Sequence, residues 1–338
     1  MGTESIEASF LSIFALISFF IFLITSKFSH KIKDGKLLDQ DFTKPQAFHI
    51  HPVTRSGGIA AVISLTVFFG IYYLIFSKFL YEYFLISFVM FFVGFLDDLK
   101  VNISPSKRLL LMIISLFFLI YFLPIQILNI DIPILLTITK NHLFSSIFVL
   151  LCFLFVINGA NLIDGFNGLL SLNLIIINII LAYINLSGAN LEFTFIITSQ
   201  IIILLSFLLF NFPRAKIFLG DSGAYLMGSL TALNTIMTNN MNPNVSSFFF
   251  CTLLFYIFFE VFFSFFRKLV QNKSPIYPDE KHLHMLSYYK ISSTVGKDKA
   301  NFLNSFLINL VYLTLIIPGL YFIDNPTLSR YWFFILLL

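Results

Sequence analysis

The sequence predicts an all-α protein that is integral to a membrane and crosses the bilayer about ten times. Its composition, its recurring apolar runs and the placement of its basic residues carry this prediction. The chain of 338 residues is 58% hydrophobic and only 11% charged, with a mean hydropathy of +0.91. Because a soluble domain carries about 25% charged residues, this composition excludes an ordinary soluble globule.

Apolar runs of spanning or near-spanning length recur along the chain. They lie near residues 8–26, 57–76, 80–96, 108–123, 143–157, 169–186, 192–210, 223–238, 247–266 and 302–322. Several are short for a hydrocarbon core of about 30 Å and must continue into their polar flanks. The first run follows Glu4 and Glu7 rather than basic residues, so we interpret it as a retained span and not as a cleaved signal.

We expect one membrane-embedded domain over residues 1–338, because the sequence contains no internal repeat, soluble domain or Gly/Ser linker. Cys152 and Cys251 both fall inside apolar runs, where they are expected to pack without forming a disulfide framework. The last apolar stretch, 331–338, is too short to span.

The basic residues set the expected orientation. With the N-terminus outside, 18 of the 21 Lys and Arg residues fall on cytoplasmic connections, and only Lys78, Lys140 and Arg330 remain outside. The net charge of +4 then reflects topology and contact with anionic lipid headgroups, and it gives no reason to expect nucleic-acid binding.

This topology places every dense polar segment on the cytoplasmic side. The segments rich in Asp, Asn, His and Gly lie at 49–58, 94–107, 158–168, 211–223 and 273–290. A transporter needs polar groups near the bilayer midplane and access from both sides. One-sided polarity therefore favours an enzyme that works at the cytoplasmic face, with active-site loops there.

The first polar segment contains Arg55-Ser-Gly57-Gly58, which combines one cation with a backbone that permits close approach. The next contains Asp97 and Asp98 at the end of the third run. Adjacent carboxylates raise each other's pKa unless a cation compensates, so the pair implies a cation. Neighbouring helical residues point about 100° apart, which favours separate roles for the two acids. The alternative is a charged helix end that meets water.

The third polar segment repeats polar residues every three positions, at Asn158, Asn161, Asp164 and Asn167. On a helix these would form one stripe able to ligate a single partner. Taken alone, the segment is equally well read as a loop between two membrane helices.

Gly220-Asp221-Ser222-Gly223 opens the eighth run, where a helix N-terminus favours an anion such as phosphate. A carboxylate at this place can hold Mg²⁺ that bridges to the phosphate, with an ordinary helix cap as the alternative. Arg214 and Lys216 add positive charge just upstream.

The largest cytoplasmic loop carries His282 and His284, whose spacing is poor for zinc and better suited to phosphate contacts. Glu260 lies inside the ninth run, seven residues before Arg267, so the two can face the same side of a helix. A carboxylate at that depth is either functional or part of a structural ion pair.

Together these segments resemble the polyprenyl-phosphate N-acetylhexosamine-1-phosphate transferases of the glycosyltransferase 4 superfamily. The resemblance covers about residues 52–286, and the order of the motifs matches as well as their residues. The matching segments are Arg55 to Gly58, Gly94 to Asp98, Asn161 to Gly165, Phe218 to Gly223 and Pro278 to His284. Three positions depart from the family pattern: Thr54 replaces Pro, Asn167 replaces Asp and Met285 replaces His.

The resemblance implies transfer of a sugar 1-phosphate from a UDP-N-acetylhexosamine to polyprenyl (undecaprenyl) phosphate, with release of UMP. It implies Mg²⁺ as cofactor, with Mn²⁺ as a substitute, and Asp221 and Asp164 as the metal ligands. It gives catalytic roles to Asp97, Asp98, Asp164 and Asp221. Substrate contacts then fall to Asn161, Arg55, Lys107, Asn167, His282, His284 and Glu260, with Lys107 pairing with the carboxylates.

The expected setting is the cell inner (plasma) membrane, at the initiating step of a lipid-linked cell-envelope glycan such as O-antigen. A homodimer is included among the expected partners. Two alternatives stay open: a non-catalytic relative that acts as transporter or scaffold in the same pathway, and the phospho-MurNAc-pentapeptide transferase branch. Because a lipid phosphate is largely ionised at pH 7, direct attack is favoured over a covalent aspartyl intermediate.

Overall fold

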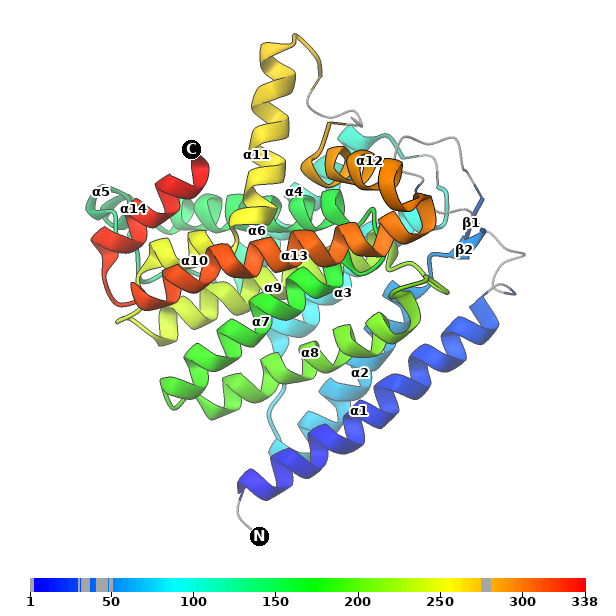
Figure 1. The fold of residues 1–338 in the computed structure, drawn as a ribbon. Coiled ribbons are helices and arrows are strands. Elements are labelled where there is room, and N and C mark those ends of the chain that lie inside the picture. Colours follow the sequence, from blue (N-terminus) through cyan, green and yellow to red (C-terminus); the bar gives the residue numbers. More distant parts are fainter. Residues whose placement is uncertain are drawn as a thin grey trace.

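The computed structural model describes residues 3–29, 31, 37–40, 48, 51–101, 103–123, 125–274 and 281–338. The described chain is helical apart from two short strands (Figure 1). The elements are α1 (Thr3–Phe28), β1 (Leu38–Asp39), β2 (Val53–Thr54), α2 (Gly57–Phe76), α3 (Tyr81–Asp98), α4 (Pro105–Phe122), α5 (Pro133–Ile138), α6 (His142–Ile163), α7 (Leu169–Ser187), α8 (Leu191–Asn211), α9 (Gly220–Met241), α10 (Ser247–Leu253), α11 (Phe255–Val270), α12 (Leu283–Val295), α13 (Lys297–Tyr321) and α14 (Pro326–Leu337).

The ten predicted runs all coincide with helices, and the ninth is divided. Among the described residues, seven helices are long and apolar enough to cross a membrane, or eight if α10 and α11 form one broken span. The other two runs fall on α3, which carries three acidic residues, and on α9, which is rich in amides and hydroxyls. The prediction of a polytopic all-α membrane protein is thus confirmed, while the number ten and the orientation stay predictions.

Local sequence signals explain where several helices begin. Asn141 accepts hydrogen bonds from the backbone N–H groups of Leu143 and Phe144 at the start of α6, and Asn325 does the same for Leu328 in α14. Such caps satisfy N–H groups that a helix cannot pair internally. Pro105 stands in the first turn of α4, where its missing N–H costs nothing.

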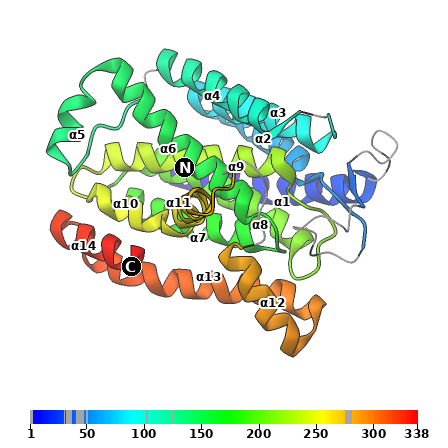
Figure 2. The ribbon, with the colours of Figure 1, turned by 90° about the horizontal axis from the view of Figure 1, so that it is seen from above.

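Helix α9 forms the centre of the bundle and packs against α2, α3, α6 and α7 (Figures 1 and 2). Its polar groups find partners there: the Asn234 side chain donates to Asn178 of α7 and Gln200 of α8 and accepts from Tyr83 of α3. Buried amides must be hydrogen-bonded to be tolerated. This network lets a helix of modest hydropathy lie at the core.

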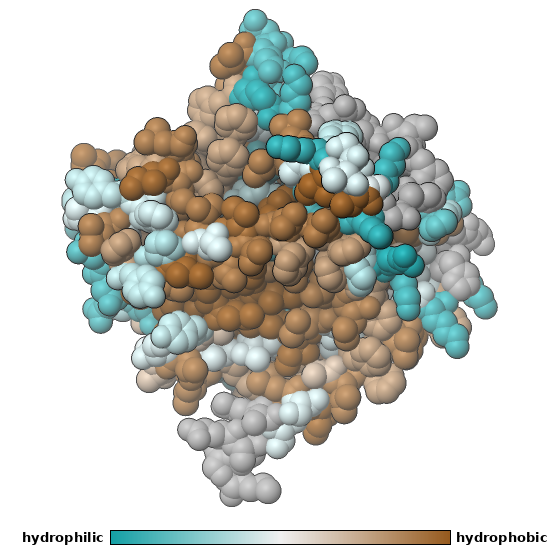
Figure 3. Space-filling view, in the orientation of Figure 1, coloured by the Kyte–Doolittle hydropathy of each residue, from teal (hydrophilic) through white to brown (hydrophobic). Residues whose placement is uncertain are grey.

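Two features distinguish the outside of the bundle. Helix α11 bends by 74° from α10 and stands out from the other helices (Figure 1). Figure 3 shows a broad apolar band across the bundle, with hydrophilic residues gathered near the strands and α12, at the tip of α11 and more sparsely at the opposite end. A lipid-facing band with polar ends is the surface expected of a membrane protein.

Candidate active site

A small ladder of backbone hydrogen bonds joins three segments of the site that are distant in the sequence. β1 pairs antiparallel with β2, with Asp39 opposite Val53, and Thr54 of β2 bridges to Ile217. The backbone N–H groups of Gly57 and Gly58 then donate to the carbonyls of Phe218 and Leu219, at 2.9 and 2.8 Å. The ladder therefore fixes the Arg55 segment against the start of α9.

Glycines permit the closest contacts around this start. A Cβ on Gly94 would lie 2.4 Å from the carbonyl oxygen of Asp221, so only glycine lets α3 approach α9 this closely. Gly220 has a φ of +75°, and a Cβ there would lie 2.7 Å from a carboxylate oxygen of Asp98. Both glycines belong to motifs singled out in the sequence.

Asp98 caps α9 from the end of α3. Its Oδ1 accepts the backbone N–H of Asp221 at 3.0 Å, and its Oδ2 accepts the backbone N–H of Ser222 at 2.9 Å and the Ser222 hydroxyl at 2.5 Å. A protein carboxylate thus accepts hydrogen bonds from the first N–H groups of this helix. The Asp98 side chain is fully buried and its hydrogen bonds hold Asp221 in place.

Asp97 has a different role from its neighbour, as predicted. Its carboxylate meets Arg108 of α4 at 2.8 Å, and the same Arg108 nitrogen donates to Oδ2 of Asp221 at 2.6 Å. The cation predicted for the acidic pair is therefore present. It is Arg108 rather than Lys107, which is exposed on the preceding position of α4.

Arg55 joins this group from the ladder. Its Nε and Nη2 donate to Asp39 at 3.0 and 2.7 Å, while Nη1 lies 3.8 Å from Asp98. Burial lowers the pKa of Arg55, but the charges of Asp221, Asp39 and Asp98 outweigh it and raise the pKa above its ordinary value. Arg55 is therefore a permanent cation of the site.

Asp164 ends α6 close to the same charges. Burial, followed by repulsion from Asp221 and Asp98, raises its pKa well above the ordinary value. Burial and the charge of Asp221 likewise raise the pKa of Asp97 to about 6 and that of Asp98 to about 7. The convergence of the four predicted acids, which lie on three separate motifs, is thus present in the structure.

The charge balance of this site suits Mg²⁺. Among the residues that the structure describes, five carboxylates, those of Asp39, Asp97, Asp98, Asp164 and Asp221, share two guanidinium groups, those of Arg55 and Arg108. No group of three or more His, Cys, Asp or Glu side chains is arranged around a metal position in the described chain. Mg²⁺ ordinarily uses one or two carboxylates together with substrate phosphates and water, and Asp221 and Asp164 are carboxylates of the kind that could hold it.

Glu260 organises the histidines on the opposite side of the site. The Nδ1 atoms of His282 and His284 donate to its carboxylate at 2.8 and 3.3 Å, and the backbone N–H of Leu283 adds a third contact. Glu260 is only 3% exposed, so it orients the imidazoles rather than facing a substrate directly. Arg267, which we placed on the same helix face, donates instead to the carbonyl of Lys281.

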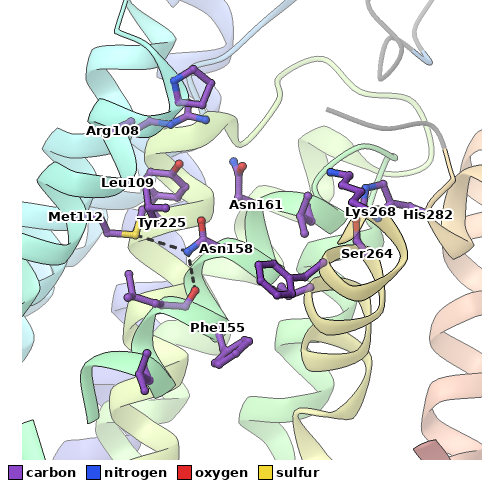
Figure 4. A pocket seen from close by; sticks show the side chains of 16 residues that line it. Arg108, Leu109, Met112, Phe155, Asn158, Asn161, Tyr225, Ser264, Lys268 and His282 are labelled. Atoms are coloured by element: carbon purple, nitrogen blue, oxygen red, sulfur yellow. Dashed lines mark hydrogen bonds between the residues drawn. The ribbon is translucent and has the colours of Figure 1, made fainter. Parts of the chain in front are cut away.

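A cavity of about 520 Å³ lies between α4, α6, α9 and α11. Figure 4 shows Arg108 on one wall, Lys268 and His282 on the other, and Asn158 and Asn161 between them. The Nε2 atom of His282 is buried and has no hydrogen-bond partner among the described residues. Most of the other lining residues are apolar, among them Leu109, Leu151, Leu154, Phe155, Leu162 and Phe265.

The polar stripe of the third motif is divided by these contacts. Asn158 and Asn161 line the cavity, whereas the Asn167 side-chain amide donates to the carbonyl of Pro213 and its backbone N–H donates to Oδ1 of Asn301. Asn167 thus ties the turn before α7 to neighbouring segments. Residues 275–280, which include Pro278 and Asp279 of the fifth motif, lie outside the described residues.

Sequence reasoning missed three residues of this site. Arg108 was assigned only to topology, Lys268 was assigned likewise although it is 5% exposed and lines the cavity, and Asp39 was not singled out. For Arg108 and Lys268 the available signal is a basic residue near the end of an apolar helix, which is also what the positive-inside rule alone would place there.

Comparisons with known proteins show what the chain is similar to. Residues 80–239 match the model of glycosyl transferase family 4. The chain is 29% identical over 288 residues to the undecaprenyl-phosphate alpha-N-acetylglucosaminyl 1-phosphate transferase of Thermotoga maritima, a match that covers 84% of this chain and 82% of that protein.

Shorter matches connect the chain to a second kind of relative. It is 34% identical over 158 residues to a phospho-N-acetylmuramoyl-pentapeptide-transferase of Clostridium perfringens, covering 44% of this chain and 50% of the relative. A protein of the same name from Streptococcus thermophilus is 34% identical over 153 residues, covering 43% of this chain and 44% of the relative. The superfamily resemblance drawn from the motifs is thereby confirmed.

Proposed function

We propose that the protein transfers an N-acetylhexosamine 1-phosphate from a UDP-sugar to polyprenyl (undecaprenyl) phosphate and releases UMP, because residues 80–239 match the model of glycosyl transferase family 4. The similarity to the Thermotoga maritima enzyme over 84% of the chain supports this reaction. The observation that carries the proposal is the meeting of Asp97, Asp164 and Asp221 with two arginines beside a cavity that both polar and apolar side chains line.

The reaction forms one P–O bond and breaks another. An oxygen of the lipid phosphate attacks the β-phosphorus of the UDP-sugar, and the bond from that phosphorus to the bridging oxygen breaks. The electron pair leaves with UMP. Since the lipid phosphate is already largely ionised at neutral pH, the step needs little base catalysis.

The residues of this chain mainly reduce repulsion between two anionic substrates. Arg55 and Arg108 supply fixed positive charge next to Asp221, where the diphosphate is expected to lie. Asp98 cannot serve readily as a base, because its carboxylate already accepts three hydrogen bonds from the start of α9. Because Asp98 is already engaged in these hydrogen bonds, we favour direct attack by the lipid phosphate.

Asp221 and Asp164 would hold Mg²⁺, or Mn²⁺ in its place, on the diphosphate. The metal would neutralise charge that develops on the leaving UMP. Asn161 would orient the nucleotide from the cavity wall, and His282 would present its Nε2 to a phosphate oxygen because Glu260 fixes the other ring nitrogen. His284 is held by the same carboxylate.

The cavity suits the lipid acceptor. Lys268 and His282 line its polar part and would bind the phosphate, while Leu151, Leu154 and Phe155 line the part expected to hold the first isoprene units. This division matches a substrate with one charged head and a long apolar chain. It also agrees with the apolar band across the face of the bundle seen in Figure 3.

The proposed location is the inner membrane with the site at the cytoplasmic face, since 18 of 21 basic residues then lie inside. The proposed pathway step is initiation of a lipid-linked envelope glycan such as O-antigen. We favour the N-acetylglucosamine branch over the phospho-MurNAc-pentapeptide branch, because the relative of the former type matches over 84% of the chain and the latter over 44%.

A panel of UDP-sugars tests the proposal. Purified protein in lipid nanodiscs is given undecaprenyl phosphate, Mg²⁺ and each of UDP-GlcNAc, UDP-GalNAc and UDP-MurNAc-pentapeptide, and UMP is quantified. We expect UMP from at least one donor, loss of it in Asp221→Asn, and retention in the control Asp131→Asn, whose carboxylate contacts Ser246 in the loop before α10.

The same panel separates the alternatives. UMP from UDP-MurNAc-pentapeptide alone would assign the chain to the other branch. No UMP from any donor, with protein that remains folded, would refute the enzyme and favour a scaffold or transporter.

A further inference from the structure

Asp39 occupies a short described stretch, residues 37–40, that no catalytic motif of the sequence includes. Its backbone pairs with Val53 in the ladder that continues through Thr54 to Ile217, three residues before α9 begins. Lys100 also donates to the carbonyl of Leu38 at 3.1 Å. Asp39 is therefore fixed by contacts on two sides and is only 8% exposed.

The side chain of Asp39 holds one edge of Arg55. Its Oδ2 accepts from both Nε and Nη2, at 3.0 and 2.7 Å. The remaining nitrogen, Nη1, is directed to the catalytic end, where it lies 3.8 Å from Asp98. A guanidinium held by one edge keeps a fixed plane and presents the other edge to a ligand.

We propose that Asp39 is a positioning residue that fixes Arg55 for the diphosphate of the nucleotide-sugar, an inference that rests on the proposed function. Arg55 is the group that would touch substrate; Asp39 acts through it. A long arginine side chain loses conformational freedom when it binds, and an arginine already fixed in the bound orientation binds with higher affinity.

Asp39 also competes for Arg55 with Asp98, which caps α9. With Asp39 neutralised, the carboxylate nearest to Arg55 among the described contacts is Asp98, and the 3.8 Å contact could shorten. That movement would draw the guanidinium away from the diphosphate. The expected defect is weaker nucleotide binding, with little change in the lipid site, because that cavity is lined by α4, α6, α9, α11 and His282.

Steady-state kinetics in nanodiscs test this role with UDP-GlcNAc, or with whichever donor the panel identifies, and undecaprenyl phosphate. We expect Asp39→Asn to raise KM for the UDP-sugar by about tenfold, the scale of one charge-assisted hydrogen bond. The kcat and the KM for the lipid should stay within about twofold of wild type, because one lost hydrogen bond to Arg55 weakens only the binding of the nucleotide. Asp39→Glu, which keeps the charge, should restore part of the affinity.

A double-mutant cycle shows whether Asp39 acts through Arg55. We expect Asp39→Ala combined with Arg55→Ala to be no worse than Arg55→Ala alone. Glu192→Gln serves as the control, because this carboxylate lies at the start of α8 and pairs with Lys78 and Tyr72. Additive losses, an unchanged KM in Asp39→Asn, or equal losses for both substrates with a lower melting temperature would each overturn the role.

Failure of the proposed function gives a different result. If wild-type protein transfers no sugar phosphate from any donor, the reaction is refuted, and the pair is tested by calorimetric binding of UDP with Mg²⁺. Equal weakening by Asp39→Asn and Arg55→Ala supports the positioning role for a nucleotide-binding site. Weakening by Arg55→Ala alone, or no binding to wild type, overturns it.

Discussion

The carboxylate of Asp98 accepts the backbone N–H of Asp221 at 3.0 Å, so the second acid of one motif places the acid of another. Asp97, its neighbour in the chain, is turned to Arg108 instead. The two adjacent carboxylates therefore have different contacts. Asp98 supports the structure of the site, and Asp97 belongs to its charged surface. This division predicts different outcomes for the two substitutions.

Asp98→Asn should lower thermal stability more than Asp97→Asn. An amide offers one acceptor oxygen, so its NH₂ group would face a backbone N–H or the hydroxyl of Ser222. A buried donor left without a partner costs about 1–3 kcal/mol. Melting temperatures of the two variants in the same detergent measure this, and equal shifts would contradict a capping role for Asp98.

Arg108→Gln should reduce turnover, whereas Lys107→Gln should not. Arg108 joins Asp97 and Asp221 at 2.8 and 2.6 Å, and Lys107 is exposed on the adjacent position. A hydrogen bond to a charged group contributes about 1.5–3 kcal/mol, so we expect a loss of at least about tenfold in kcat/KM. The reverse ranking of the two variants would show that the pairing seen here is not the working one.

Asn167→Asp should destabilise the protein without changing its dependence on Mg²⁺. The Asn167 amide donates to the carbonyl of Pro213, and a carboxylate cannot replace that donor. Asn167→Ala loses the same bond without adding a charge and should be less destabilised. Titration of activity with Mg²⁺ checks the second part, and a shifted metal requirement in Asn167→Asp would instead place this residue in the metal site.

The metal-free protein should become less stable as pH rises from about 4 to 7. Burial and Asp221 raise the pKa of Asp97 to about 6 and that of Asp98 to about 7, against about 3.9 in an unfolded chain. Between these values the folded state binds more protons than the unfolded state, so the free energy of unfolding falls with pH. The extra stability is complete below about pH 4 and is lost above about pH 7.

Melting temperatures in EDTA at pH 5 and pH 8 measure this effect, and Asp97→Asn should flatten the dependence. Added Mg²⁺ should raise the melting temperature more at pH 8 than at pH 5, because metal binding requires ionised carboxylates. A larger effect of Mg²⁺ at pH 5 would argue against carboxylate ligation.

The helices and the gathering of motifs could be predicted from the sequence because both depend on local patterns. Apolar runs specify helices wherever backbone groups must be satisfied in lipid, and the alternation of sides brings the polar connections to one face. Asp97, Asp164 and Asp221 meet for this reason. The break between α10 and α11 has no such signal, because it falls at Leu254 and not at a helix-breaking Pro or Gly.

Individual partners required the tertiary structure. A one-residue step on a helix changes direction by about 100°, so choosing between Lys107 and Arg108 needs the rotation of α4. The contact of Asp98 with Ser222 joins residues 124 positions apart, and that of Asp39 with Arg55 depends on a two-residue strand within a polar connection. Neither pairing leaves a periodic pattern in the sequence.

The fate of each phosphate tests the central claim most directly. UDP-GlcNAc, or the donor the panel identifies, is labelled with ³²P either at the α or at the β position and incubated with nanodiscs, undecaprenyl phosphate and Mg²⁺. The proposed reaction sends the β label into the lipid fraction and leaves the α label in UMP, in equal amounts. Both labels recovered together in UDP, or no label in lipid, would contradict transfer of a sugar 1-phosphate.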